Sequence, residues 1–397
     1  MRKKTVRDID VSGERVLVRV DYNVPLDKDT GAILDDKRIR ATLPTIDYLR
    51  LQGARAILLS HLGRPKGRDP KLSLRPVAQR LSEMIGAPVK TADDTIGPAA
   101  QEAVAALEPG DVLLLENVRY HEEEEANDPE FAKALASLCD VYVNDAFGTA
   151  HRAHASTVGV ASAMGGRPAV AGFLMEKEID FLGRAMSDPE RPFAAIIGGA
   201  KVSSKMAVLE SLLDRVDKLL VGGGMANTFL KAEGFGVAES LVEDDYVDEA
   251  RRVEAKAGER SVRLLLPADV IVAERFEADS PARRVSVKDV PDGWRIMDVG
   301  ETTIDVFAHA LRDCKTVVWN GPMGVAEMPA FSHGSQRLAA VIASLEATTI
   351  VGGGETAAVV EAMGLEDKFS HVSTGGGASL EFLEGRELPG VAALMDA

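Results

Sequence analysis

Short apolar runs rich in β-branched residues alternate along this chain with longer stretches in which apolar residues recur at helical spacing. An uninterrupted apolar run of about four to eight residues is typical of a strand buried on both faces of a parallel sheet. Such runs occupy residues 16–20, 56–60, 112–115 and 141–143 in the first half, and 194–197, 218–221, 263–266, 316–319 and 348–351 in the second. This alternation predicts an α/β fold whose parallel sheets carry helices on both faces.

A helix with breakers at both ends separates the two halves of this pattern. Residues 170–186 carry apolar side chains at helical spacing. Helix-breaking residues flank the stretch, namely Gly165, Gly166, Pro168, Pro189 and Pro192. Because a bounded amphipathic helix between two strand–helix arrays is typical of a connection between domains, the pattern predicts two α/β domains joined by an inter-domain helix.

Four apolar runs in the second half end in glycine-rich turns. They read FAAIIGGAK (193–201), KLLVGGG (218–224), TTIVGGGET (348–356) and HVSTGGG (371–377). Glycine lets the backbone turn tightly and approach a ligand, and a helix that follows directs free N–H groups toward an anion. Any one turn also fits an ordinary loop, so only the four together predict a nucleotide or phosphate site. The P-loop and dinucleotide fingerprints are both absent.

Composition and charge exclude several classes of protein. The 397 residues suggest two or three domains, and the net charge of −16 argues against nucleic acid and anionic membranes as partners. No apolar stretch reaches the length of a membrane span, and the first residues lack the apolar segment of a secretory signal. The two cysteines, Cys139 and Cys314, have no disulfide or zinc spacing. We therefore expect a cytoplasmic monomer.

Cationic and polar residues follow the predicted strands of the first half. In an open α/β sheet, ligands bind outside the carboxyl ends of the strands. The residues at those ends are Asp21, Asn23, His61, Arg64, Arg119, His151, Arg152 and His154, and Arg38 opens the helix after the first strand. Any one arginine is more often part of a surface ion pair. Several at one sheet edge predict a site for a small polyanion, because guanidinium donates in pairs to phosphate and carboxylate.

Two lysines of the second half stand where a helix disfavours them. Lys201 and Lys205 are four residues apart, in what the periodicity predicts to be the first turns of a helix. The positive end of the helix dipole and the mutual repulsion both oppose lysine there, so a nearby phosphate would explain the pair better than simple exposure. Two acids follow predicted strands. Glu327 is suited to ribose hydroxyls, and Glu355, beside a glycine turn, is suited to Mg²⁺.

Taken together, these segments resemble phosphoglycerate kinase. The resemblance runs in order through RVLVRVDYNVP, SHLGRPKG, ENVRYHEEEE, NDAFGTAHRAHAST, GGAKVSSK, GGGMANTFLKA, WNGPMGVAE, GGGETAA and HVSTGGGASLEFLEGRELPGVAAL. It covers nearly the whole chain. It implies two Rossmann-like parallel-sheet domains that face a cleft. Residues 1–170 would bind 3-phosphoglycerate, 171–186 would be the inter-domain helix and hinge, 187–378 would bind nucleotide, and 379–397 would return to the N-terminal domain.

The same resemblance implies a reaction and a set of site residues. The reaction is reversible phosphoryl transfer between 1,3-bisphosphoglycerate and ADP, in line and after hinge closure, with Mg²⁺ bound to the nucleotide. The acid substrate would be bound by Asp21, Asn23, Arg38, His61, Arg64, Arg119 and Arg152. The nucleotide side would comprise Lys205, Glu327, Gly352, Gly353, Gly354, Glu355 and Thr356, with Glu355 on the metal. Transfer would rely on Arg38, Lys201, Lys205, Gly375 and Gly376.

Three positions depart from the family pattern, and two other classes of function compete. The family usually has Asp at Glu355, often glycine at Ile296 and usually proline at Glu301; a side chain at Ile296 would narrow the base site. A nicotinamide-dependent dehydrogenase would need the missing dinucleotide fingerprint. A phosphate-binding protein without activity would lack the lysine pair or the metal acid, and both are present here.

Overall fold

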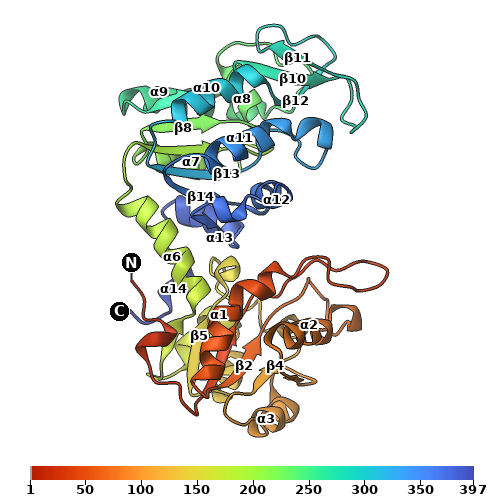
Figure 1. Ribbon diagram of the computed structural model, residues 1–397, viewed down its shortest axis with the longest axis vertical. Helices are drawn as coiled ribbons and strands as arrows, with labels where there is room; N and C mark the ends of the chain where they lie inside the picture. The colour runs from red at the N-terminus through yellow and green to blue at the C-terminus, as the bar shows by residue number, and fades with distance from the viewer. Residues whose placement is uncertain (1) are drawn as a thin grey trace. The chain divides into compact units, whose positions relative to one another are not determined.

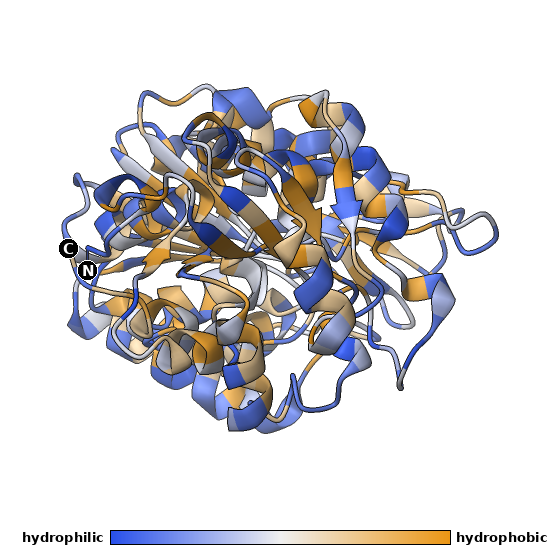
Figure 2. Cartoon of the chain, turned by 90° about the horizontal axis from the view of Figure 1, so that it is seen from below, coloured by the Kyte–Doolittle hydropathy of each residue, from blue (hydrophilic) through white to orange (hydrophobic). Residues whose placement is uncertain are grey.

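The chain folds into two compact units, described here from a computed structural model that covers residues 2–397. The N-terminal unit comprises Met1–Asp180 with Glu387–Ala397, and the C-terminal unit comprises Phe181–Arg386. Each unit is built around a parallel sheet of six strands (Figure 1). Most strands of both sheets are buried, and Figure 2 shows hydrophobic strands with hydrophilic stretches on the helices around them, as the alternating pattern predicts.

The sheet of the N-terminal unit has the order β3-β4-β2-β1-β5-β6, and its paired strands are all parallel. The strands are β1 (Arg15–Arg19), β2 (Arg55–Leu59), β3 (Val89–Thr91), β4 (Val112–Leu114), β5 (Val141–Asn144) and β6 (Ala169–Ala171). The four predicted strands agree with the structure to within one residue at each end. On one side of β1 lie β2, then β4, then β3, and on the other side lie β5 and β6. The winding direction of the chain therefore reverses between β1 and β5.

Helices surround this sheet, and the end of the chain joins it. The helices are α1 (Lys37–Leu51), α2 (Arg75–Ile85), α3 (Gly97–Ala105), α4 (Pro129–Ser137), α5 (Val160–Ala163) and α14 (Pro389–Ala392). The C-terminal segment packs on this unit, since the Lys4 N–H donates to the Met395 carbonyl at 2.9 Å and the Asn144 amide donates to the Gly390 carbonyl at 3.2 Å.

The predicted inter-domain helix is α6 (Phe173–Ser187), which passes from one unit to the other at Asp180 and Phe181. Its first turn is capped by the buried Asp145, which follows β5. Asp145 Oδ1 accepts from the Leu174 and Met175 N–H groups at 2.9 and 3.2 Å. Gly172 permits this contact, because a Cβ there would lie 2.2 Å from the same oxygen.

Asp145 gives the stability of the protein a specific pH dependence. Burial raises the pKa of Asp145 to about 6, although the backbone N–H groups of α6 act in the opposite direction. Because the pKa is higher in the folded state than in the unfolded chain, protonation favours folding. The stability of the wild type relative to Asp145→Asn should therefore fall by about 2 kcal/mol as the pH rises from about 4 to about 6.

Urea unfolding followed by circular dichroism across this pH range measures the difference. Asp140→Asn is the control, since the Arg15 guanidinium holds the pKa of Asp140 at about 2. Its effect should stay constant over the same range. A constant difference for Asp145→Asn as well would contradict the assignment.

The main sheet of the C-terminal unit has the order β15-β14-β13-β7-β8-β9, also with parallel pairs throughout. The strands are β7 (Phe193–Ile197), β8 (Lys218–Val221), β9 (Arg263–Leu265), β13 (Thr316–Asn320), β14 (Thr348–Gly352) and β15 (His371–Val372). The chain winds outward from β7 in one direction and from β13 in the other. Ligands of open α/β sheets bind at such a reversal, at the carboxyl ends of the strands.

A second, antiparallel sheet in this unit is absent from the sequence-based prediction. It has the order β11-β10-β12, with β10 (Asp269–Ala273), β11 (Ala282–Ser286) and β12 (Arg295–Val299). The edge strand β11 reads ARRVS and is largely exposed, so it lacks the apolar run that marks the parallel strands. The helices of the unit are α7 (Met206–Leu213), α8 (Ala226–Ala232), α9 (Val247–Glu259), α10 (Glu301–Leu311), α11 (His333–Ala343), α12 (Gly354–Ala362) and α13 (Gly377–Leu383).

Candidate functional site

The polar residues predicted in the N-terminal unit lie at the carboxyl ends of adjacent strands. Asp21 and Asn23 follow β1, His61 follows β2, Arg119 follows β4 and Arg152 follows β5. Because β1 lies between β2 and β5, and β4 lies beside β2, the sheet order brings these positions to one edge. The polar residues of this group therefore follow four strands of the same sheet.

Hydrogen bonds connect several of these side chains directly. Arg38, the second residue of α1, donates through Nη1 to Asp21 Oδ2. Asn23 Oδ1 accepts from the Gly63 N–H at 2.8 Å, and Arg119 Nη1 donates to the Gly63 carbonyl at 2.7 Å. Burial disfavours the Asp21 carboxylate, but the charges of neighbouring groups, including Arg38, hold its pKa below the usual value. Asp21 therefore stays ionised and holds Arg38.

His61 is neutral in the folded protein and lies beside a buried arginine that the sequence analysis did not single out. Arg19 is 1% exposed, and its Nη2 lies 3.2 Å from His61 Nδ1. Burial lowers the pKa of His61 well below its usual value, and the charge of Arg19 acts in the same direction. Since guanidinium can only donate, Nδ1 accepts and the proton resides on Nε2. The sequence signal that was available, and was overlooked, is a charged residue inside the apolar run RVLVRV.

Arg64 and Arg152 lie at the margin of this group. Arg64 is exposed and lines a cavity of about 710 Å³ together with Arg119. Arg152 Nε lies 3.2 Å from His151 Nε2. Both guanidinium groups remain available for an anion, which agrees with the prediction that they bind the acid substrate but does not test it.

The acidic run Glu122–Glu125 leaves three of its four side chains exposed and buries one. Glu124 is fully buried, and its carboxylate accepts from the Ser156 N–H at 2.8 Å and from Ser156 Oγ at 2.6 Å. Ser156 in turn accepts from Arg19 Nε at 2.7 Å. The run forms turns rather than a helix, because Glu124 belongs to the buried polar network beneath the cationic residues.

In the C-terminal unit the four glycine turns lie at the carboxyl ends of β7, β8, β14 and β15. Their glycines allow neighbouring loops to approach backbone to backbone. A Cβ on Gly223 would lie 2.6 Å from the Gly199 nitrogen, and one on Gly198 would lie 2.2 Å from the Pro322 carbonyl oxygen. Helices α8, α12 and α13 follow three of the turns closely, so their free N–H groups are directed toward the same edge of the sheet.

The predicted helical position of the two lysines is wrong. Helix α7 begins at Met206, with Lys205 as its N-cap, and Lys201 lies in the preceding loop. The loop departs from a helix because Ser203 donates through its N–H and Oγ to the Glu243 carboxylate, at 2.8 and 2.6 Å. Lys205 Nζ donates to Asn320 Oδ1, at the end of β13, whereas Lys201 is exposed.

The environment of Lys205 and Asn320 suits a phosphate. Burial lowers the pKa of Lys205, and the carboxylates of Glu355 and Glu384 oppose this shift. Asn320 is 2% exposed, and its Nδ2 has no hydrogen-bond partner within residues 2–397. Sequence reasoning overlooked Asn320, which stands in the segment TVVWNGP where β13 ends. A cationic amine and a free amide donor therefore lie at the reversal of the sheet.

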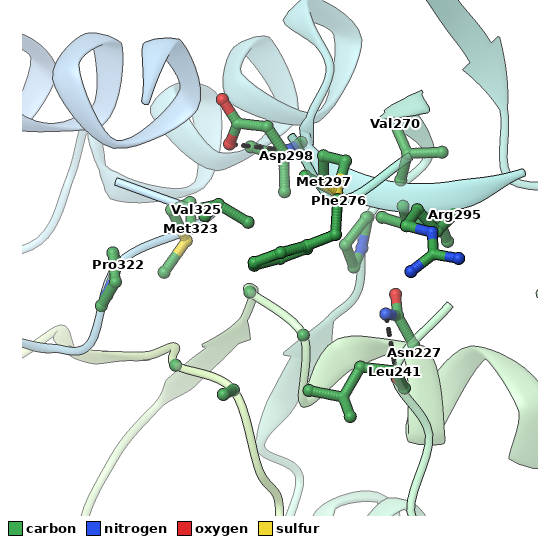
Figure 3. Close-up of a pocket in the computed structure, with 18 of the residues that line it drawn as sticks. Asn227, Leu241, Val270, Phe276, Arg295, Met297, Asp298, Pro322, Met323 and Val325 are labelled. Atoms are coloured by element: carbon green, nitrogen blue, oxygen red, sulfur yellow. Dashed lines mark hydrogen bonds between the residues drawn. The ribbon is translucent and has the colours of Figure 1, made fainter. Parts of the chain in front are cut away.

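A cavity of about 460 Å³ opens beside the glycine turns of β7 and β8. Figure 3 shows Phe276 reaching into it between Met323 on one side and Leu241 on the other. Glu327 and Glu355 both line the cavity and are exposed, and Glu355 lies in the first turn of α12. One wall is therefore apolar, and the exposed carboxylates of Glu327 and Glu355 belong to the polar part of the lining.

The remaining predicted positions also lie in this unit. Gly352, Gly353 and Gly354 lead from β14 into α12, and Thr356 Oγ1 accepts from the Gly321 N–H at 2.7 Å. Gly375 and Gly376 precede α13, and Gly376 has φ +48°. The structure also places Ile296 and Glu301, two of the positions that depart from the family pattern. Ile296 lines the cavity, and Glu301 begins α10, where the helix dipole favours an acid and His333 Nε2 lies 2.9 Å from its Oε1.

Within residues 2–397 no group of three or more His, Cys, Asp or Glu side chains has the arrangement of a metal site, and no helix is long and apolar enough to cross a membrane.

The chain matches known proteins over nearly its whole length. The family model for phosphoglycerate kinase matches residues 6–386. Phosphoglycerate kinases from Moorella thermoacetica and Chloroflexus aurantiacus are 57% and 58% identical, each aligned over 100% of both chains. The solved phosphoglycerate kinase of Coxiella burnetii has a TM-score of 0.88 at 43% identity, and covers 98% of each chain. That of Pyrococcus horikoshii has a TM-score of 0.86 at 33% identity, with 99% of this chain and 98% of the other covered. The chain therefore belongs to the phosphoglycerate kinase family.

Proposed function

We propose that this phosphoglycerate kinase binds its acidic substrate in the N-terminal unit and its nucleotide in the C-terminal unit. Family membership establishes the reaction, which is reversible phosphoryl transfer between 1,3-bisphosphoglycerate and ADP to give 3-phosphoglycerate and ATP. The observation that carries the assignment of sites is the convergence of cationic side chains at one sheet edge in one unit, against glycine turns and a cavity in the other.

The acid substrate would meet two kinds of group in the N-terminal unit. Arg64, Arg119 and Arg152 offer guanidinium donors to phosphate and carboxylate. Asp21 and Asn23 are suited to the substrate hydroxyl. Neutral His61 would donate through Nε2, because Arg19 occupies Nδ1.

The nucleotide would occupy the cavity with its base against the apolar wall. Phe276 and Leu241 are 54% and 49% exposed in the absence of a ligand, and an aromatic base would cover them. Glu327 would accept from the ribose hydroxyls. The phosphates would lie along the turn Gly352–Thr356 toward Lys205. Ile296, in the same lining, would limit the space for the base.

The residues present are compatible with Mg²⁺ on the nucleotide. Mg²⁺ bound with a nucleotide takes most of its ligands from phosphate and water and needs one or two carboxylates from the protein. Glu355 supplies one such carboxylate. It lines the nucleotide cavity, and its charge acts to raise the pKa of the Lys205 amine. Glu355 would hold the ion, which neutralises phosphate charge.

Transfer needs charge neutralisation and alignment more than a protein nucleophile. Arg38, Lys201 and Lys205 would stabilise the negative charge that spreads over the moving phosphoryl group, and the N–H groups at Gly375 and Gly376 would help hold it. Because the two reactants are assigned to different units, we propose that closure of the units brings them in line and excludes water.

We further propose that the enzyme acts as a cytoplasmic monomer without nucleic acid. The net charge of −16 supports this, as does the finding that two of the four large apolar side chains exposed within residues 2–397, Leu241 and Phe276, line the nucleotide cavity.

A coupled assay of ATP consumption tests the assignment of function. ATP should be consumed only when 3-phosphoglycerate and Mg²⁺ are both present. Consumption that does not depend on 3-phosphoglycerate, or none with all three components, would contradict the proposal.

A further inference from the structure

The segment that carries Glu327 has a buried carboxyl group at its base. Residues 321–332 connect β13 to α11, and Glu327 lies near the middle of them. Asp298, in β12, is 1% exposed. Its Oδ2 accepts from the Gly334 N–H at 2.7 Å, in the first turn of α11, and its Oδ1 accepts from the Val299 N–H at 2.8 Å.

The carboxyl group of Asp298 lies next to Gly324, near the start of the segment, and next to Gly334, just beyond its end in α11. A Cβ on Gly324 would lie 2.3 Å from Asp298 Oδ1, and one on Gly334 would lie 2.4 Å from the same atom. Only glycine leaves room for the carboxyl group at these two positions. The Val325 N–H also donates to the Met297 carbonyl at 2.9 Å, so β12 holds the segment next to Asp298 as well.

The carboxyl group is not placed to meet a ligand. Figure 3 shows it pointing away from the Phe276 ring, on the side of β12 toward α11. Its hydrogen bonds are to backbone N–H groups of β12 and α11. A buried carboxyl group is costly unless it is well bonded, so a structural reason for its presence is needed. The shared contact with Gly324 and Gly334 supplies that reason, because it sets where the Glu327 segment leaves and returns.

We propose that Asp298 is the positioning residue that places Glu327 against the ribose of the bound nucleotide. The inference rests on the proposed ribose role of Glu327. Asp298 acts on affinity for the ribose hydroxyls through the geometry of the segment, and takes no part in the transfer step.

The test compares dissociation constants for ADP and 2′,3′-dideoxy-ADP by calorimetry. In the wild type the dideoxy analogue should bind about tenfold more weakly, since Glu327 has no hydroxyls to accept from. Glu327→Gln should reduce this discrimination. Asp298→Asn should reduce it to a similar extent and leave kcat at saturating ADP within about twofold of the wild type.

A matched control separates positioning from general stability. Asp269 is also a buried carboxyl group that caps a helix, since it accepts from the Thr302 and Thr303 N–H groups of α10 at 3.2 and 2.7 Å. Asp269→Asn should lower stability and leave the discrimination unchanged. Gly324→Ala should displace the segment while Asp298 stays in place, and should therefore reduce the discrimination between the two nucleotides. This variant replaces Asp298→Asn in the test if Asp298→Asn does not fold.

The possible failures are distinguishable. The positioning role alone is overturned if Asp298→Asn discriminates between ADP and 2′,3′-dideoxy-ADP as the wild type does, while Glu327→Gln loses this discrimination. The same outcome in Gly324→Ala counts equally where that variant replaces Asp298→Asn. Wild-type discrimination in Glu327→Gln would overturn the ribose role of Glu327, and the positioning role with it.

Discussion

Replacing Arg38 with alanine should lower kcat by about 10²-fold or more and change the dissociation constant of 3-phosphoglycerate by less than about tenfold. Arg38 lies in the first turn of α1 and is 38% exposed in its side chain, although it donates to Asp21. A guanidinium held in this way is preorganised. Its charge should matter most as negative charge spreads over the phosphoryl group in transit, and less for the substrate at rest.

Steady-state kinetics and calorimetry on the same preparation separate the two effects. Arg40→Ala is the matched control, because Arg40 lies on the same helix and pairs with Asp36 at 2.7 Å on the exposed surface. It should leave both quantities unchanged. A raised dissociation constant with unaltered kcat in Arg38→Ala would show that Arg38 binds substrate and does not act in transfer.

Replacing Glu355 with glutamine should weaken the binding of Mg-ADP by about tenfold and that of metal-free ADP by less than about twofold. The proposed reason is that Glu355 is the one protein carboxylate on the ion. Glu355→Asp should retain activity, because it restores the acid that the family usually has.

Calorimetric titration with ADP, in Mg²⁺ and in EDTA, measures this difference. Glu327→Gln is the control from the same cavity. Its effect should be equal with and without metal, because Glu327 is assigned to the ribose hydroxyls and not to the ion. If Glu355→Gln binds Mg-ADP as tightly as the wild type, the metal assignment is wrong.

Most of the parallel strands were predictable from the sequence, because a strand buried on both faces reads as an uninterrupted apolar run. The strand β3 was missed, since it reads VKT and is only partly buried. The glycine turns were predictable for a related reason, since Gly198 and Gly223 lie where neighbouring backbones meet and any side chain would clash. Strands of this kind and their turns define most of the fold.

Other features depend on tertiary contacts that local patterns do not reveal. The loop before α7 follows from the distant pairing of Ser203 with Glu243, which competes with the helix that its periodicity favours. The burial of Glu124 follows from contact with Ser156, 32 residues away. The importance of Arg19 and Asn320 depends on partners in other segments. Side chains of these types are usually exposed, so their burial is visible only in the structure.

The most direct test of the division of the reaction between two units is small-angle X-ray scattering with and without both ligands. In the proposed mechanism each ligand would add charged contacts to its own unit, and only the closed form would complete them around the transferring group. The radius of gyration should fall when 3-phosphoglycerate and a non-transferable Mg-ATP analogue are both bound, and should change little with either alone. An unchanged radius with both sites demonstrably filled would contradict closure, and the role of α6 as a hinge would have to be abandoned.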